Sequence, residues 1–259
     1  MNDPAPAQEL LKPVIILVGP QMGENIGACA RAMLNCDVTE LRLVRPRDGW
    51  PNPAATAMAA GADHILEQAI VFNSTREALA DLHRVYATTV RPRDMIKPVL
   101  TPREAAARAV EAGTAGTRVG FLFGPENAGL ENADVALADA VVTAPLNPNF
   151  GSLNLAQAVL LVTYEWYQII HEQCPCKADA PCPKDLPPQR EALDMLFDKL
   201  VLLLDERGYF RSPDMRDKLI LSIRNMIQRM EPTAQDVQSL HGLIVGLSRP
   251  KSAQGSETV

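Results

Sequence analysis

The stretch "NPNFGSLNLAQAV", residues 147 to 159, decides how this sequence is interpreted, because it opens a helix in an unusual way. Three asparagines, a proline and a glycine crowd into its first eight residues, directly before an apolar run that continues to Ile170. One capping side chain is enough for a helix start, and Ser152 can supply it. The surplus of polar residues therefore predicts a second role, which is to line the pocket of a cofactor.

Short β-branched runs alternate with helical patterns before this stretch. The apolar runs predict strands over residues 14–18, 41–44, 69–72, 84–88, 118–123 and 140–144. The 3.6-residue patterns predict helices over residues 25–35, 53–60, 74–82, 101–112, 131–137 and 152–171. This alternation indicates the α/β class, with a mostly parallel sheet that is covered by helices on both faces.

The composition changes after the last of these helices. Residues 172–189 contain five prolines and no apolar period, which is typical of a linker. Helical spacing without any strand returns over residues 190–207, 213–230 and 233–246. We therefore expect a sheet domain over 1–171, a Pro/Cys-containing linker over 172–189, and a small all-helical extension over 190–259 whose end is disordered.

Composition limits the class of protein and its compartment. The chain has 259 residues, is 47% hydrophobic and carries a net charge of -6, so the whole surface is not a general polyanion binder. Its apolar runs are shorter than the roughly 18 residues of a membrane span, and its start lacks the features of a signal peptide. We expect a soluble cytoplasmic protein with no membrane partner.

The cysteines raise the question of a metal. Five is an odd number, which argues against a secreted disulfide framework. Cys174, Cys176 and Cys182 cluster in the linker, and His171 could be a fourth ligand, but their spacing is not a recognised zinc pattern. Incidental cysteines in a linker, with no required metal, are the favoured interpretation.

Four polar loops follow predicted strands. Ligands of open parallel sheets bind beyond the carboxyl ends of the strands, so these loops belong to one edge. They are "GPQMGENIGACARAM" (19–33), "TTVRPR" (88–93), "FGPENAGL" (123–130) and the stretch from 147. The first is neither the GxGxxG of a dinucleotide fold nor a P-loop, and as a bare glycine pattern it could be only a tight turn. Taken together, the four loops predict a ligand site.

Three segments carry a family resemblance. "NIGACAR" (25–31), "LFGPENAGL" (122–130) and "PLNPNFGSLNLAQA" (145–158) resemble the three ordered motifs of SpoU-type RNA 2′-O-ribose methyltransferases of the SPOUT class. The resemblance runs from about residue 13 to 171. The tail over residues 202–244 is similar to the helical C-terminal extension of TrmJ-like tRNA methyltransferases.

This resemblance implies a fold, a reaction and partners. The expected fold is an α/β SPOUT fold with a deep C-terminal trefoil knot, in a homodimer built around the knot. The expected cofactor is S-adenosyl-L-methionine, and the expected reaction is 2′-O-methylation of a pyrimidine ribose in the anticodon loop of tRNA. A methyltransferase acting on rRNA and a catalytically inactive RNA-binding relative remain as alternatives. A Rossmann-type dehydrogenase is disfavoured, because the fingerprint and an acidic residue after the second strand are missing.

The resemblance also implies site residues. Those expected to hold the cofactor, largely through backbone groups, are Thr88, Thr89, Val90, Gly124, Ala144, Leu146, Gly151, Ser152 and Leu153. Those expected in catalysis are Arg31, Asn25, Glu126, Ser152 and Asn154. Arg31 would activate the ribose hydroxyl, reaching it from the partner subunit. Because a guanidinium is a poor base, electrostatic positioning is easier to defend than proton abstraction. Gly151 and Pro125 depart from common family members, so contacts there would be through the backbone.

Each of these residues also has a structural alternative. Asn25, Glu126 and Ser152 are all suitable helix caps, and Arg31 could be an ordinary exposed arginine. Their joint occurrence in family order favours the active site. The aromatic segment "YEWYQII" (164–170) is expected to pack in the core or at a dimer interface rather than to stack on bases.

Basic residues gather locally despite the acidic total. Arg42, Arg45 and Arg47 lie near the end of one predicted strand and could grip phosphates. The positions predicted to contact RNA are Arg91, Arg93 and Lys97 beside the pocket, and Arg211, Arg216 and Lys218 in the tail. We expect the helices over 190–246 to dock RNA, and their removal to leave a folded core that binds the cofactor. The alternative is that they only pack on the dimer.

Overall fold

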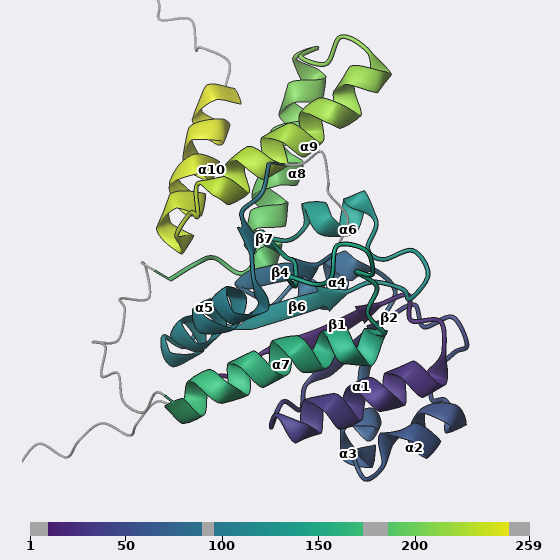
Figure 1. The fold of residues 1–259 in the computed structure, drawn as a ribbon. Helices are drawn as coiled ribbons and strands as arrows, with labels where there is room; N and C mark the ends of the chain where they lie inside the picture. The colour runs from purple at the N-terminus through teal and green to yellow at the C-terminus, as the bar shows by residue number, and fades with distance from the viewer. Residues whose placement is uncertain (1–9, 90–95, 173–185, 249–259) are drawn as a thin grey trace, which may run out of the picture.

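The structure, a computed structural model, describes residues 10–89, 96–172 and 186–248, in which seven strands form one parallel sheet (Figure 1). The strands are β1 Val14–Val18, β2 Leu41–Val44, β3 Ile70–Phe72, β4 Arg84–Thr88, β5 Val99–Leu100, β6 Val119–Phe123 and β7 Ala140–Val142. Their order in the sheet is β3-β2-β1-β6-β4-β7-β5, and every pair is parallel. The predicted α/β class with a parallel sheet is therefore confirmed.

Helices cover both faces of this sheet. On one face lie α1 Gly23–Asn35, α2 Pro53–Ala59, α3 Asp63–Glu67, α5 Pro102–Thr114 and α7 Leu155–Glu172. On the other lie α4 Thr75–Leu79 and α6 Asn132–Ala136. Figure 1 shows α1, α5 and α7 lying across the near side of the strands, and α7 packs against both of the others. The C-terminal helices are α8 Arg190–Glu206, α9 Pro213–Arg229 and α10 Ala234–Ser248.

The central strands are apolar on both sides, as burial between two helical layers requires. All five residues of β1 are buried, and successive side chains point to opposite faces. Ile15 and Leu17 join the core beneath α1 and α7, whereas Val14 and Ile16 join the core beneath α4 and α6. The predicted core role of segment 164–170 holds for Trp166 and Ile169, which are 1% and 5% exposed.

The structure differs from the sequence-based expectations at several elements. Two short elements, α3 and β5, were not predicted. The long helix begins at Leu155 rather than at residue 152. Its start is capped by Asn154, whose Oδ1 accepts a hydrogen bond from the Ala156 backbone N–H at 2.9 Å. The interpretation of Ser152 as the cap was therefore wrong.

The C-terminal helices form a cluster of their own and also dock on the sheet domain. Leu196, Ile227 and Val237 are buried together, one from each helix. The first turn of α8 donates backbone hydrogen bonds to the carbonyls of Leu82 and Ala80. These helices therefore continue the cover on the α4 and α6 side, where α6 contacts α9. They are anchored to the core, not only tethered to it.

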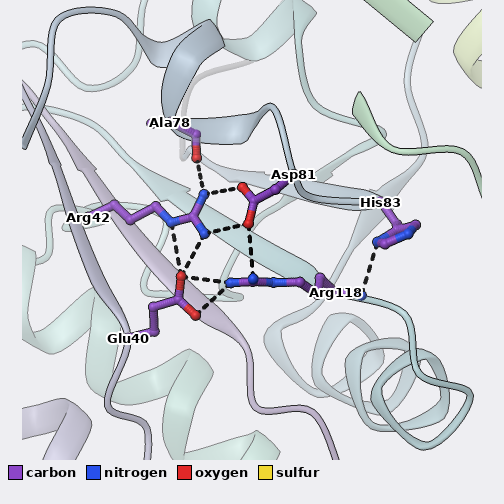
Figure 2. Close-up of polar contacts among 6 residues, drawn as sticks. All are labelled: Glu40, Arg42, Ala78, Asp81, His83 and Arg118. Atoms are coloured by element: carbon purple, nitrogen blue, oxygen red, sulfur yellow. Dashed lines mark hydrogen bonds and ion pairs between the residues drawn. The ribbon is translucent and has the colours of Figure 1, made fainter. Parts of the chain in front are cut away.

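A buried arginine organises the amino-terminal edge of the sheet, as Figure 2 shows. The Arg42 side chain, 5% exposed, donates to the Ala78 carbonyl at 2.7 Å and pairs with the carboxylates of Glu40 and Asp81. Arg118 bridges the same two carboxylates, at 2.7 Å and 3.0 Å. The suggestion that Arg42 grips phosphates was wrong, because its donors are committed inside the protein at the edge opposite the loops after the strands.

The Asp81 carboxyl makes the stability that this network contributes depend on pH. Its hydrogen bond from Arg42 lowers the pKa of Asp81 below the ordinary value. The stabilisation is therefore complete above the unfolded-state pKa of about 3.9 and is lost as the pH falls through the folded-state pKa. We expect the free energy of unfolding of the wild type to fall more steeply than that of Asp81→Asn between about pH 5 and pH 2. Urea titrations at several pH values measure this, and parallel curves would contradict the expectation.

Candidate functional site

A cavity of about 330 Å³ opens at the carboxyl ends of β4, β6 and β7. This is the edge at which open parallel sheets bind ligands, and the volume lies near the lower end of the roughly 300–1,000 Å³ common for ligand pockets. The three strand ends are fastened to one another beneath it. Thr88 Oγ1 donates to the Leu122 carbonyl and Thr143 Oγ1 to the Thr89 carbonyl, both at 2.8 Å. The cavity therefore has a floor that the sheet itself holds in place.

Most of the predicted cofactor residues meet at this cavity. Those that line it are Thr88, Thr89, Gly124, Ala144, Ser152 and Leu153. Leu146 and Gly151 belong to the same loop as Ser152 but do not line the cavity. Val90 lies outside the described residues. The structure thus brings three separate loops together as the motif resemblance implied, and their role toward a cofactor remains a prediction.

The apolar wall of the cavity was not predicted residue by residue. Phe123 and Pro102 contribute to it, and α7 adds Leu155, Ala158 and Val162. The signal was present in the sequence, because positions 155, 158 and 162 share one helical face. Leu155 and Val162 also belong to the buried core, so this face serves both purposes.

A chain of hydrogen bonds joins three segments beside the cavity. Asn154 Nδ2 donates to Asn25 Oδ1 at 3.1 Å, and Asn25 Nδ2 donates to Glu126 Oε1 at 2.7 Å. The second oxygen of Glu126 accepts from the Gln21 backbone N–H at 2.9 Å. Glu126 also lines the cavity. The side chains of Asn25, Glu126 and Asn154, predicted as site residues from motif order, therefore form one connected group.

The capping interpretations of Asn25 and Glu126 were wrong. Met22 is the N-cap of α1, which places Asn25 inside the first turn. The N-cap of α6 is Glu131, so Glu126 precedes that helix by several residues. Neither side chain therefore acts as the N-cap of the helix for which it was considered. Their bonds run between segments about 100 residues apart in the chain, which is the arrangement expected of a site.

Arg31 stands apart from this group. It is exposed on α1, six residues after Asn25, which corresponds to about 9 Å along the helix axis and a different face. Within residues 10–89, 96–172 and 186–248 it makes no hydrogen bond or ion pair. Glu126 therefore bonds to Asn25 and not to Arg31.

The residues predicted to contact RNA behave differently from one another. Lys97 is half-buried, and its amine donates to the Ala136 and Ala138 carbonyls and to Gln228. Burial lowers the pKa of Lys97 to about 7, against its usual value near 10.5. Its amine is thus committed inside the protein, and the prediction that it grips phosphate was wrong.

Arg216 is also engaged. Its guanidinium makes two hydrogen bonds to Asp205, at 3.0 Å and 2.6 Å, and lies over the Phe210 ring. Arg211 and Lys218 are exposed. Arg91 and Arg93 lie outside the described residues.

Two further arginines lie at the edge that bears the cavity. Arg45 follows β2 directly, is exposed and has a positive φ of 46°. The Arg47 backbone N–H donates to the Pro20 carbonyl, and its side chain pairs with Asp48 at 2.9 Å. The pKa of Arg47 is raised mainly by Asp48, with a smaller contribution from the Glu126 carboxylate. Arg47 therefore lies near the hydrogen-bonded group to which Glu126 belongs.

The described ranges contain neither a metal centre nor a membrane span. No group of three or more His, Cys, Asp or Glu side chains there is arranged to hold a metal ion. Cys174, Cys176 and Cys182 lie outside those ranges, and His171 Nδ1 lies 2.9 Å from the Tyr167 carbonyl. No described helix is both long and apolar enough to cross a bilayer.

Comparison with known proteins identifies the class to which this fold and site belong. Residues 12–164 match the model of the SpoU rRNA Methylase family. The chain therefore belongs to the SpoU methylase family, and the predicted resemblance is confirmed.

Relatives and solved structures agree with this placement. The chain is 30% identical over 242 residues to a tRNA (cytidine/uridine-2′-O-)-methyltransferase TrmJ from Cronobacter sakazakii, covering 92% of this chain and 96% of that protein. It is 45% identical to the crystal structure of TrmJ from Z. mobilis ZM4, with a TM-score of 0.82, covering 92% and 100%. The SpoU methyltransferase AviRb from Streptomyces viridochromogenes, solved in complex with AdoMet, shares the fold at 19% identity with a TM-score of 0.51 over 66% and 63%.

Proposed function

We propose that this protein transfers a methyl group from S-adenosyl-L-methionine to a ribose 2′-hydroxyl of tRNA. The observation that carries the proposal is the meeting of the second and third family motifs at one cavity, with Asn25 of the first motif bonded to Glu126 and Asn154 beside it. Relatives named as tRNA 2′-O-methyltransferases, similar over nearly the whole chain, support tRNA as the substrate class. We expect the target to be a pyrimidine nucleotide of the anticodon loop.

The cavity fits S-adenosyl-L-methionine. Glycines and alanines at positions 124, 128, 129, 144 and 158 keep its walls open, so that backbone groups can face a ligand. Leu153, Leu155 and Phe123 offer apolar surface suited to an adenine ring. When bound, this cofactor supplies a methyl group carried on a sulfonium. The chain holds it through loop backbone and excludes water with the apolar face of α7.

The remaining chemistry falls to the side chains around the ribose. A ribose hydroxyl is a very weak acid, so it must be held in line with the methyl group and must lose its proton as the bond forms. In our proposal Asn25 and Asn154, fixed by Glu126 and by the start of α7, orient the ribose, and Ser152 contributes at the loop. Arg31 positions the substrate electrostatically, since a guanidinium is a poor base.

The isolation of Arg31 favours a homodimer. A single chain does not bring Arg31 to the polar group, so the proposal assigns Arg31 to the site of the partner subunit. Exposed apolar side chains on the same helical layer, Leu160 and Tyr164 of α7 and Leu34 of α1, offer surface for such a contact. The expected oligomer is a symmetric pair, which light scattering measures.

The strand order supports the proposed trefoil knot. β7 lies between β4 and β5, so the connection between those two strands spans from one side of β7 to the other. Thr89 N–H donates to the Val142 carbonyl and Thr143 N–H to the Leu100 carbonyl, so the chain leaves β7 between the carboxyl ends of β4 and β5. It then continues into α7. A threaded path is rare enough that only the family resemblance suggested it.

Methylation of purified tRNA tests the proposed function. The protein is incubated with labelled S-adenosyl-L-methionine and unmodified tRNA, and 2′-O-methyl groups are located by the resistance of the adjacent linkage to alkali. A label in the anticodon loop is the expected result. A label only in rRNA would redirect the proposal to the rRNA alternative, and cofactor binding without any RNA label would favour an inactive relative.

Two glycines provide a matched prediction. A Cβ on Gly124 would lie 2.1 Å from the Leu130 backbone nitrogen, so Gly124→Ala is expected to lower the free energy of unfolding by about 1–3 kcal/mol. A Cβ on Gly151 would meet only the Asn147 carbonyl at 3.9 Å, so Gly151→Ala is expected to leave stability unchanged. Because the cofactor is proposed to be held by the backbone of this loop, the added methyl group is expected to weaken cofactor binding. Denaturation and calorimetric titration separate the two effects. Unchanged cofactor affinity in Gly151→Ala would remove Gly151 from the site.

A further inference from the structure

Phe150 is exposed in a way that no other described aromatic side chain matches. It is 74% exposed, against 52% for Tyr209 and 50% for Tyr164. Exposing a phenylalanine to water forfeits the roughly 1.5–3 kcal/mol that burial of such a side chain contributes. An exposed ring is common enough singly on a surface. The position of Phe150 in the fold therefore decides whether its exposure has a functional role.

The backbone that carries Phe150 is held in a defined turn. The Phe150 N–H donates to the Asn147 carbonyl at 2.9 Å, and the two residues form an isolated bridge. The Asn147 side chain accepts from the Asn149 N–H at 3.0 Å, which closes the turn a second time. Two of the three asparagines in the stretch 147–159, Asn147 and Asn149, therefore serve to hold this turn. Their bonds fix where the ring is presented.

This turn belongs to the loop that contributes Ser152 and Leu153 to the cavity. Ser152, which lines the cavity, follows Phe150 by two residues, so their Cα atoms are at most about 7 Å apart. Asn154, which begins the hydrogen-bonded chain to Asn25 and Glu126, lies four residues beyond Phe150. The loop that walls the cavity therefore also presents the most exposed aromatic ring of the described residues.

We propose that Phe150 is the platform on which a base of the RNA substrate stacks, holding the target nucleotide so that its ribose faces the cavity. The proposal rests on the proposed function. A ribose at this site brings its base to within a few ångströms of the surrounding surface, and single-stranded bases bind proteins by stacking on aromatic rings. Stacking is tolerant of base identity because every base has a π-face, so Phe150 contributes affinity and orientation without reading the sequence.

Three substitutions at Phe150 test this assignment. Phe150→Ala is expected to lower kcat/KM for RNA by about 5- to 150-fold, chiefly through KM, because one stacked base is lost. Phe150→Leu keeps apolar bulk without a π-face and is expected to lose nearly as much. Phe150→Trp is expected to retain activity. Ile70→Ala, on β3, is the matched control for loss of an exposed apolar side chain away from the site, and it is expected to retain activity.

A spectroscopic measurement accompanies the kinetics. The chain has two native tryptophans, so the Phe150→Trp variant adds one reporter at the site. Its extra fluorescence is expected to be quenched when unmodified tRNA is added in the presence of S-adenosylhomocysteine, while the wild-type signal changes less. Cofactor affinity and oligomeric state are expected to be the same in all variants.

The outcomes are distinguishable. Full activity of Phe150→Leu would overturn the stacking role, and so would an absence of quenching in Phe150→Trp. Dissociation of Phe150→Ala into monomers would show instead that the ring packs on a partner subunit. If the wild type fails to methylate any RNA, the proposed function fails. If the wild type is active and Phe150→Ala matches it, only the present inference fails.

Discussion

Replacing Arg31 by alanine is expected to lower kcat for RNA methylation by about 100- to 1,000-fold while leaving cofactor affinity within about twofold. Removal of one preoriented donor that stabilises charge developing in a transition state costs about that factor. Arg31 is available for this task, because among the described residues it makes no bond within its own chain. Single-turnover methylation assays and calorimetric titration of the cofactor measure the two quantities.

Two controls sharpen this prediction. Arg31→Lys keeps the charge and loses the planar fork, so it is expected to recover only part of the rate. Arg103→Ala removes an arginine whose side chain is 62% exposed and which pairs with Glu165 at 3.5 Å, and it is expected to remain active. Mixing Arg31→Ala with an inactive Asn25→Ala variant tests the exchange between subunits. Recovered activity in the mixed dimer is the expected result, and equal loss of cofactor affinity in Arg31→Ala would contradict its assignment.

Replacing Arg190 by alanine is expected to lower the free energy of unfolding by about 3–5 kcal/mol. Removing one partner of a buried ion pair leaves the other charge uncompensated, and such losses are of that size. The Arg190 side chain is 1% exposed and pairs with Asp139, which is 11% exposed. Among the described residues, the Asp139 carboxylate would keep the Val85 N–H and the Arg84 guanidinium at 4.0 Å. Chemical denaturation followed by circular dichroism measures the change.

Arg211→Ala is the matched control, since Arg211 is exposed on the same C-terminal unit. Its effect on stability is expected to be below about 0.5 kcal/mol. A loss under about 1 kcal/mol in Arg190→Ala would show that the ion pair does not hold the unit in place.

The docking of the C-terminal helices changes the expectation for their removal. Deletion of residues 190–246 was expected to leave the core intact. In the structure it would expose Asp139, free Arg76 from Asp194, and take Gln228 away from Lys97. We now expect the truncated core to be destabilised, so loss of methylation alone would not demonstrate RNA docking. Substituting the exposed Arg211 and Lys218 in the full chain is the cleaner test, with the salt dependence of RNA binding as readout.

Much of the fold was predictable because its signals are long or strongly apolar. β1 and β6 are five-residue apolar runs buried on both faces, and such short runs are typical of central strands in a parallel sheet. β5 has two residues, and Val99 is 67% exposed, so it carries neither length nor an apolar pattern. Its pairing with β7 is a consequence of the sheet around it. α3 has five residues, which is too short for its sequence to show a helical pattern.

The candidate site was predictable where the order of the family motifs indicated which residues lie close together. Asn25, Glu126 and Asn154 are far apart in sequence, and no local pattern says that they bond. The fate of charged side chains was harder to predict. Lys97 and Arg216 read as exposed basic residues, yet each is satisfied by acceptors from other elements, which local composition does not reveal. Arg31 could be named from its motif, whereas its separation from Asn25 required coordinates.

The order of strands in the sheet has a consequence for synthesis on the ribosome. β1 and β2 emerge early and pair with each other, but the other neighbour of β1 is β6, where Ile15 meets Phe121. At about 5–20 residues per second, the 74 residues between Val44 and Val119 take about 4–15 s to be made. Throughout that interval the nascent chain carries an apolar strand with one edge unpaired, a state prone to association. Production of soluble protein is therefore expected to depend on chaperones that bind nascent chains and on the rate of translation across this interval.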